Sequence, residues 1–182
     1  MQKFGTILLT FLTIAITAKA QSETKSPDVP DNVPLPYASR SFPVGKKVKY
    51  YNLKDIEGNI IKAEDLKGKI VVLNFWFTNC PACRKETPAL NELAFEYARQ
   101  PDVVFIAIAL DHRWDIRDFL KTHPLSYSII EDGQIYADRY GVHEYPTNVV
   151  LDRQGKVLFS DAGFASTVEY WLRKNIEAAK KN

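Results

Sequence analysis

The sequence predicts an α/β fold in which a mixed sheet carries helices on both faces. Two observations support this prediction. Expected strands and helices alternate along the chain and end in two adjacent strands followed by a helix, an order typical of a mixed sheet. In addition, residues 102–110 (DVVFIAIAL) form a continuous apolar run of strand length, which indicates a strand covered by helices on both sides. A chain of 182 residues is long enough for one such domain.

The first 43 residues are expected to lie outside this domain. Lys3, an apolar run over residues 7–16 and the small residues of Ala18-Lys19-Ala20 form the pattern of a signal peptide spanning residues 1–20. A membrane anchor is the alternative, but the apolar run is shorter than the roughly 20 residues needed to cross a bilayer. Residues 21–43 hold five prolines and many small polar residues, which predicts a flexible linker before a domain at residues 44–182.

The charge balance argues against a nucleic-acid partner. Removal of residues 1–20 takes away Lys3 and Lys19 and no acidic residue, so the 24 basic residues become 22, against 22 acidic residues. A net formal charge of zero gives no electrostatic basis for binding nucleic acid. We also expect no stable membrane insertion once the signal peptide is removed.

The elements of the domain are expected in a definite order. Residues 47–53 and 59–62 flank a turn and predict a β-hairpin, and residues 63–68 predict a short helical turn. The elements that follow are a strand at 70–77, a helix from Pro81 that Pro88 kinks without ending, a strand at 102–110, a helix at 114–123, a strand at 127–130, a helix at 133–140, strands at 147–151 and 156–160, and a terminal helix at 166–181 capped by Ser166 or Thr167.

Cys80 and Cys83 lie between the strand at 70–77 and the helix that follows it. The start of a helix favours a thiolate, because backbone N–H groups and the positive end of the helix dipole point at it. A disulfide closing so small a loop adds little stability, so we expect the pair to be functional. Cys80 is expected to be the exposed nucleophile, and Cys83, one turn inside the helix, the resolving thiol.

Half of a zinc site is the alternative for these cysteines. Tetrahedral zinc would need two further ligands. The chain's histidines are not at the spacing of paired ligands: they are His112, His123 and His143. We therefore expect no metal site at the cysteine pair.

The run NFWFTNCPACRKETP, preceded by LKGKIVVL and followed by EYPTNVVLDRQGKVL, resembles exported thioredoxin-like proteins of the TlpA/ResA type. The resemblance covers about residues 44–178. It implies a thioredoxin fold with an N-terminal β-hairpin and a central strand–helix insertion at residues 127–141. It also implies periplasmic thiol-disulfide exchange, with no cofactor other than the redox-active disulfide Cys80-Cys83.

The resemblance also implies roles for residues around the cysteines. Trp76 matches the tryptophan that packs beneath the active site, with a plain core aromatic as the alternative. Asn74 stands where ordinary thioredoxins have a buried aspartate that accepts the proton of the second thiol, which asparagine cannot do. Glu86 matches an assisting glutamate of the ResA-type branch, one turn after Cys83; the alternative is a solvated surface glutamate.

Tyr145-Pro146-Thr147 matches the loop that faces the cysteines with a cis proline, although trans is the default for an X–Pro bond. The resemblance implies that Tyr145 and Pro146 bind an extended segment of the substrate. Two departures from the family pattern lie at the cysteines. Pro81-Ala82 is an unusual dipeptide between them, at the position that adjusts the redox potential. Asn79 replaces the usual tryptophan, which should make the rim of the site more polar and leaves substrate preference open.

Three functions remain after this reasoning. The first is a reductase for disulfides in exported proteins, with apocytochrome c as one candidate and a membrane thiol reductant as electron donor. The second is a disulfide oxidase or isomerase that uses the same site. The third is a Sco-like copper-delivery module, which would use His143 but is disfavoured by the Cys-x-x-Cys spacing. The Thr-x-x-Cys motif of a peroxiredoxin is absent, because Thr78 precedes Cys80 by two residues.

Overall fold

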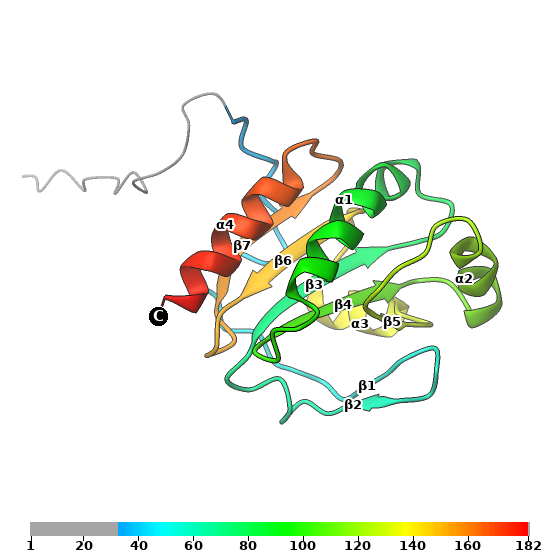
Figure 1. Cartoon of the computed structure of the whole chain (residues 1–182), viewed down its shortest axis with the longest axis horizontal. Helices are drawn as coiled ribbons and strands as arrows, with labels where there is room; N and C mark the ends of the chain where they lie inside the picture. The colour runs from blue at the N-terminus through cyan, green and yellow to red at the C-terminus, as the bar shows by residue number, and fades with distance from the viewer. Residues whose placement is uncertain (1–32, 182) are drawn as a thin grey trace, which may run out of the picture. The chain divides into compact units, whose positions relative to one another are not determined.

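A five-stranded mixed sheet forms the centre of the protein, in a computed structural model that describes residues 33–181 (Figure 1). The strand order is β5-β4-β3-β6-β7. Strand β3 pairs in parallel with β4 and antiparallel with β6, so it lies in the middle of the sheet. The strands are β3 (Ile70–Trp76), β4 (Val103–Ala109), β5 (Ser128–Ile130), β6 (Thr147–Leu151) and β7 (Val157–Ala162).

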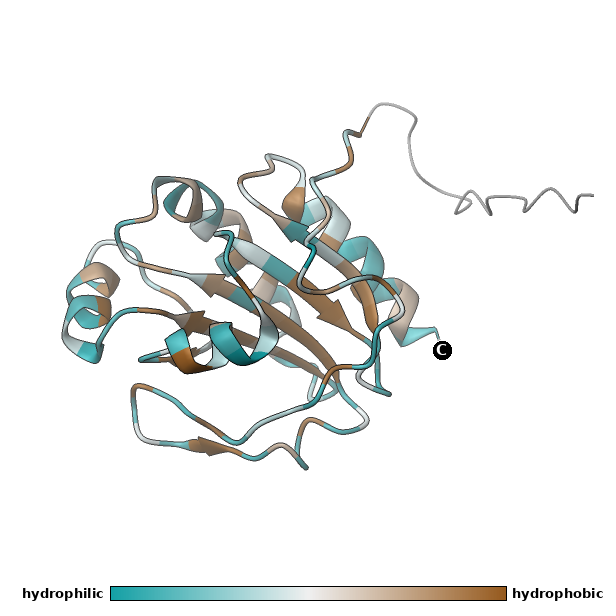
Figure 2. Ribbon diagram, turned by 180° about the vertical axis from the view of Figure 1, so that it is seen from behind, coloured by the Kyte–Doolittle hydropathy of each residue, from teal (hydrophilic) through white to brown (hydrophobic). Residues whose placement is uncertain are grey.

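Helices cover both faces of this sheet. Helices α1 (Pro81–Tyr97) and α4 (Val168–Lys180) lie side by side on one face, and α3 (Gln134–Tyr140) lies on the other (Figures 1 and 2). Helix α2 (Arg113–Leu120) follows β4. The predicted fold class is therefore confirmed, including the strand–helix insertion, which is β5 and α3. Helix α1 also continues through Pro88, as expected.

The sheet is apolar because it is enclosed. Every residue of β3 is buried, and Figure 2 shows the central strands as the most hydrophobic part of the ribbon. Val71, Leu73 and Phe75 face a core cluster that also contains Ala137 of α3. Side chains alternate across a strand, so Asn74 projects to the opposite face, toward the side of α1 and α4.

The N-terminal hairpin is shorter than predicted. Strand β1 (Leu53–Lys54) pairs antiparallel with β2 (Ile60–Ile61). The Asp55 carboxylate accepts bonds from the backbone N–H groups of Glu57 and Asn59, which shape the turn. Residues 47–52 do not form a hairpin strand, because Lys47 bridges to Lys156 instead. Residues 63–68, predicted as a short helical turn, form consecutive turns.

The predicted flexible linker is wrong for residues 33–43, which pack on the domain. The carbonyl of Pro34 accepts hydrogen bonds from the Thr167 hydroxyl and the Trp171 indole, each at 3.0 Å. The carbonyl of Tyr37 accepts one from the Ala162 N–H, and Phe42 is only 1% exposed. Prolines favour an extended chain, but these contacts fix that chain in place. Thr167 accordingly precedes α4 without capping it through its side chain.

The predicted signal peptide at residues 1–20 and the linker at residues 21–32 lie outside the described residues, as does residue 182. Within residues 33–181, no helix combines the length and apolar character needed to cross a membrane.

Candidate active site

Cys80 and Cys83 form a disulfide at the start of α1, with an S–S distance of 2.08 Å. Strand β3 ends at Trp76, and a three-residue turn carries the chain to Cys80, which is the N-cap residue. The Cys83 N–H points at Cys80 Sγ, 3.0 Å away. Pro81 begins the helix, where its missing N–H costs nothing. Oriented donors at the sulfur are the feature that stabilises a thiolate there after reduction.

Cys80 is not exposed in this disulfide state, contrary to prediction. The exposed fraction is 3% for Cys80 and 2% for Cys83. The bond to Cys83 holds the Cys80 side chain in an apolar cluster that includes Trp76 and Phe119. The prediction failed because the position of Cys80 just before a helix suggests a solvent-exposed side chain. Its disulfide partner Cys83 and the surrounding apolar residues determine the actual exposure.

Trp76 fits both of the readings given to it. Its ring packs 5.0 Å from the Phe119 ring, in the cluster that contains both cysteines, so it supports the disulfide from below. It is also a core residue, only 2% exposed. So buried a side chain offers almost no surface to a substrate, and the predicted substrate contact of Trp76 can only be indirect in this state.

Glu86 is a buried acid rather than a solvated one. Its side chain lies on α1 one turn after Cys83, and the residue is 2% exposed. Oε1 accepts a bond from the Ala165 N–H at 2.9 Å, and Oε2 accepts one from Asn148 Nδ2 at 3.0 Å. Burial raises the pKa of Glu86 to about 7, against the opposing effect of these two hydrogen bonds. The carboxyl therefore changes protonation state near neutral pH.

Asn148 connects Glu86 to Asn74. The two asparagines lie directly opposite each other on β6 and β3, and Asn74 Nδ2 donates to Asn148 Oδ1 at 2.7 Å. Asn148 Nδ2 then donates to Glu86. The residue that replaces the usual aspartate is thus joined to the acid expected to take over its role, through one intervening carboxamide.

A second buried acid, Asp161, adjoins this network. Asp161 Oδ1 accepts the backbone N–H of Asn148 at 3.1 Å, and the residue is 0% exposed. Burial, and next the charge of Glu86, raise the pKa of Asp161 to about 8. Sequence reasoning missed both Asn148 and Asp161. Polar residues inside otherwise apolar strands were the signal that could have found them.

The Tyr145–Pro146 peptide bond is cis, as the resemblance implied. The loop is next to the disulfide because Thr147, which begins β6, pairs with Phe75 near the end of β3. The Tyr145 ring packs edge-on against Phe77, with 5.6 Å between centroids, and contacts the apolar cluster around the cysteines.

A polar cavity of about 270 Å³ is lined in part by Thr78 and Asn79, the two residues that precede Cys80. Asn79, which is exposed, contributes to its wall together with Arg84 and Phe119. The Arg84 guanidinium donates to the Thr78 carbonyl and lies 5.7 Å from the centre of the Phe119 ring. The rim before the first cysteine is therefore polar, as the loss of a tryptophan at Asn79 suggested.

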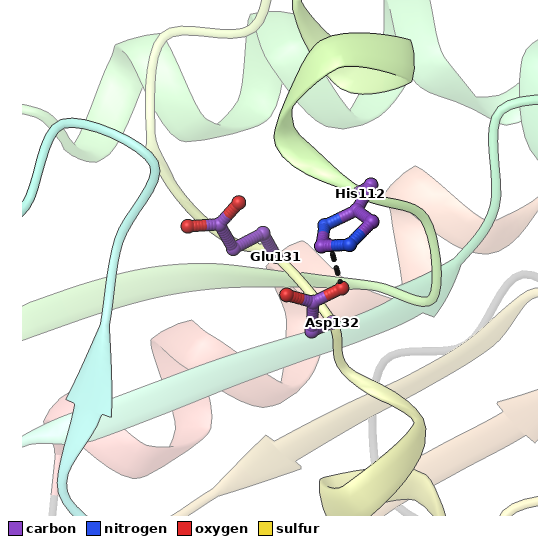
Figure 3. A group of neighbouring side chains, drawn as sticks. All are labelled: His112, Glu131 and Asp132. Atoms are coloured by element: carbon purple, nitrogen blue, oxygen red, sulfur yellow. Dashed lines mark ion pairs between the residues drawn. The ribbon is translucent and has the colours of Figure 1, made fainter.

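A group of potential metal ligands, His112, Glu131 and Asp132, lies elsewhere in residues 33–181 (Figure 3). Their ligand atoms are within 4.8 Å of one another. However, His112 Nδ1 pairs with Asp132 at 3.0 Å, and Glu131 is already engaged by the Arg113 side chain and backbone N–H. These pairs fix the start of α2 to the end of β5, and we assign no metal to them. His143 is exposed and lines a separate cavity.

Comparison with known proteins shows the family to which the chain belongs. The sequence model of the AhpC/TSA family matches residues 44–160. The chain belongs to the AhpC/TSA family. Thiol-disulfide oxidoreductase ResA of Bacillus thuringiensis is 38% identical over 117 residues, which cover 63% of this chain and 67% of that protein. Thioredoxin-like protein YneN of Bacillus subtilis is 35% identical over 115 residues, covering 62% and 68%.

Solved structures agree with this assignment. A thiol:disulfide interchange protein DsbE from Chlorobium tepidum superposes with a TM-score of 0.68 and 30% identity, covering 76% of this chain and 98% of that one. The predicted thioredoxin-like fold is thereby confirmed. With the Cys80–Cys83 disulfide, these relatives make this AhpC/TSA protein a thiol-disulfide oxidoreductase of the ResA/DsbE type.

Proposed function

We propose that this AhpC/TSA protein is an exported, periplasmic reductase that opens disulfides in other exported proteins by exchange through Cys80 and Cys83. The observation that carries the proposal is the Cys80–Cys83 disulfide at the start of α1, with the Cys83 N–H directed at Cys80 Sγ. The signal-peptide pattern of residues 1–20 supports export. Relatives named ResA and DsbE support disulfide exchange as the reaction.

The catalytic cycle requires two exchanges. In the reduced enzyme, the Cys80 thiolate attacks a substrate disulfide and releases one substrate thiolate, which leaves a mixed disulfide on Cys80. Cys83 then loses its proton and attacks Cys80 Sγ, which releases the second substrate thiolate and forms the Cys80–Cys83 disulfide. A membrane thiol reductant reverses these steps on the enzyme: its two thiols become a disulfide and the enzyme returns to the dithiol form.

Glu86 is the group proposed to take the Cys83 proton. It lies one turn along the same helix and is buried, with a pKa near 7 that suits proton transfer at neutral pH. Asn74 cannot accept a proton, because its carboxamide does not titrate. Glu86 would return the same proton to the Cys83 thiolate when the reductant opens the disulfide.

The substrate is proposed to dock as an extended segment along Tyr145 and Pro146. The cis peptide supports this role, as does the contact of Tyr145 with Phe77 and with the apolar cluster that contains both cysteines. Trp76 supports the same site from beneath. Apocytochrome c is a proposed client because it is an exported protein with a pair of cysteines.

Two cysteine variants test this proposal. Cys83→Ser should accumulate mixed disulfides with substrate, because nothing resolves the bond to Cys80, whereas Cys80→Ser should form none and lose insulin-disulfide reductase activity. Trapping in periplasmic extract, followed by mass spectrometry of the captured proteins, identifies the clients. Reductase activity that survives in Cys80→Ser would refute the assignment of Cys80 as the nucleophile.

The oxidase or isomerase alternative depends on the reduction potential of the same disulfide. Pro81-Ala82 keeps this alternative open, because the dipeptide between the cysteines adjusts that potential. A value close to the roughly −270 mV of thioredoxin supports a reductase, and one close to the roughly −120 mV of DsbA supports an oxidase.

A further inference from the structure

Two buried carboxylates meet at a single residue, Asn148. Glu86 on α1 accepts from its Nδ2 at 3.0 Å, and Asp161 on β7 accepts from its backbone N–H at 3.1 Å. Both acids are almost inaccessible, at 2% and 0% exposure. Because both carboxylates bond to the same residue in a buried environment of low polarity, negative charges on Glu86 and Asp161 would repel each other.

In the described part of the chain, residues 33–181, no ion pair offsets this repulsion. Neither Glu86 nor Asp161 pairs there with a lysine, arginine or histidine. The second carboxyl oxygen of Asp161 is buried and has no hydrogen-bond partner among the described residues. A buried carboxylate oxygen without a donor is costly when charged and much less so when protonated.

The surroundings offer few other titrating groups. The Tyr127 phenol, which precedes β5, is near enough for its pKa to be raised by burial and by the charge of Glu86. Asn74 on β3 and the Ala165 N–H ahead of α4 contribute uncharged dipoles to the network. Cys83 contributes a titrating thiol once the disulfide is reduced.

We propose that Glu86 and Asp161 hold one proton between them near neutral pH, and that Asp161 is a positioning residue which sets how much of Glu86 is ionised. This inference rests on the proposed role of Glu86 as proton acceptor for Cys83. With one proton on the pair, either carboxyl can be the charged one. When Cys83 attacks, its proton passes to the pair, which then holds two protons; reduction of the disulfide returns one proton to Cys83.

The electrostatics agree with this arrangement. The charge of Glu86 is one of the forces that raise the pKa of Asp161 to about 8, after burial itself. Coupled acids lose their protons in two steps that belong to the pair rather than to either residue. Coupling is also reciprocal, so Asp161 must act on Glu86 by the same free energy with which Glu86 acts on Asp161.

Carboxyl-carbon NMR titration of the oxidised protein, labelled with ¹³C at Glu and Asp carboxyls, tests the pair directly. We expect Glu86→Gln to lower the midpoint of Asp161 by on the order of one pH unit, and Asp161→Asn to lower that of Glu86 by less, because Glu86 is the acid that ionises first. Asp65→Asn, at an exposed position, is the control and should shift neither. Midpoints that do not move in either variant would overturn the proposal. Because the two variants are reciprocal, either one suffices if the other does not fold.

Enzyme kinetics provide the second test. The rate at which Cys83 resolves a preformed mixed disulfide on Cys80 should depend on two ionisations in the wild type, and on one, at lower pH, in Asp161→Asn. A residue that only supports the fold would change the rate without changing the shape or position of this profile. The NMR titration uses the oxidised protein and needs no turnover. Midpoints that stay unchanged in both variants therefore refute the role of Asp161, whereas reductase activity in Cys80→Ser refutes the proposed function.

Discussion

Replacing Glu86 by glutamine should stabilise the oxidised protein at pH 8 and have much less effect at pH 4. Glutamine matches the shape of the neutral acid and can still occupy the site between Ala165 and Asn148. The carboxamides of Asn148 and Asn74 then both turn over, so that each donor still faces an acceptor. The variant therefore keeps the packing of Glu86 and removes its titration.

The expected size follows from the burial of Glu86. Its pKa is 4.5 when unperturbed and about 7 in the folded protein. Below pH 4.5 both the folded and the unfolded states hold the proton, so ionisation adds no penalty. As the pH rises from 4.5 to 7, the unfolded state ionises first and folding loses free energy, on the order of 3 kcal/mol at about 1.4 kcal/mol per pH unit. The wild type carries this penalty in full above pH 7, and the glutamine variant does not.

Urea unfolding at pH 4, 5, 6, 7 and 8, followed by tryptophan fluorescence with the disulfide intact, measures this difference. The free energy of unfolding of Glu86→Gln minus that of the wild type should rise across the series. Glu92→Gln is the matched control, because Glu92 is exposed on the same helix. A difference that stays flat from pH 4 to pH 8, or that falls, would refute the reasoning that burial of Glu86 penalises its charged form by more than its two hydrogen bonds offset.

Two further substitutions test the packing around the site. Phe42→Ala should lower the free energy of unfolding by roughly 3–5 kcal/mol, because Phe42 is 1% exposed in the core. The same urea titration measures this loss. A loss below about 1 kcal/mol would mean that residues 33–43 are not packed on the domain. Gly133→Ala should lower the free energy of unfolding by roughly 1–3 kcal/mol, because the added Cβ would lie 2.6 Å from the Ala109 carbonyl oxygen and from Ile108 Cγ2. Gln134→Ala is the control. Equal melting temperatures for the two variants would contradict the clash.

The disulfide and its position could be predicted because everything that places it is local. A buried strand, a short turn and a helix beginning at Pro81 follow one another in the chain, and the periodicity of the residues reveals each of them. The burial of Glu86 could not be predicted in this way. Its hydrogen-bond partners, Asn148 and Ala165, are 62 and 79 residues away, and only the sheet register and the packing of α1 bring them together.

Asp161 was missed for a related reason. The predicted strand ended at Ser160, whereas β7 continues to Ala162 and pairs Asp161 with Asn148. The proline-rich composition of residues 21–43 correctly indicates an extended chain, but composition does not show whether the carbonyls of that chain find donors. Those of Pro34 and Tyr37 do, so this part belongs to the domain.

Residues 37–56 cover the two edge strands of the sheet. Strands β7 and β5 are the outer strands of the sheet, and an open outer strand is a template for pairing with another chain. Residues 37–48 hydrogen-bond to Val157 and Ala162 of β7 and to Gly155 just before it, while Asp55 and Ile56 pair with β5. Both edges of the sheet are thus covered by the protein's own chain. A chain shortened to begin at residue 57 would expose both edges of the sheet and should aggregate.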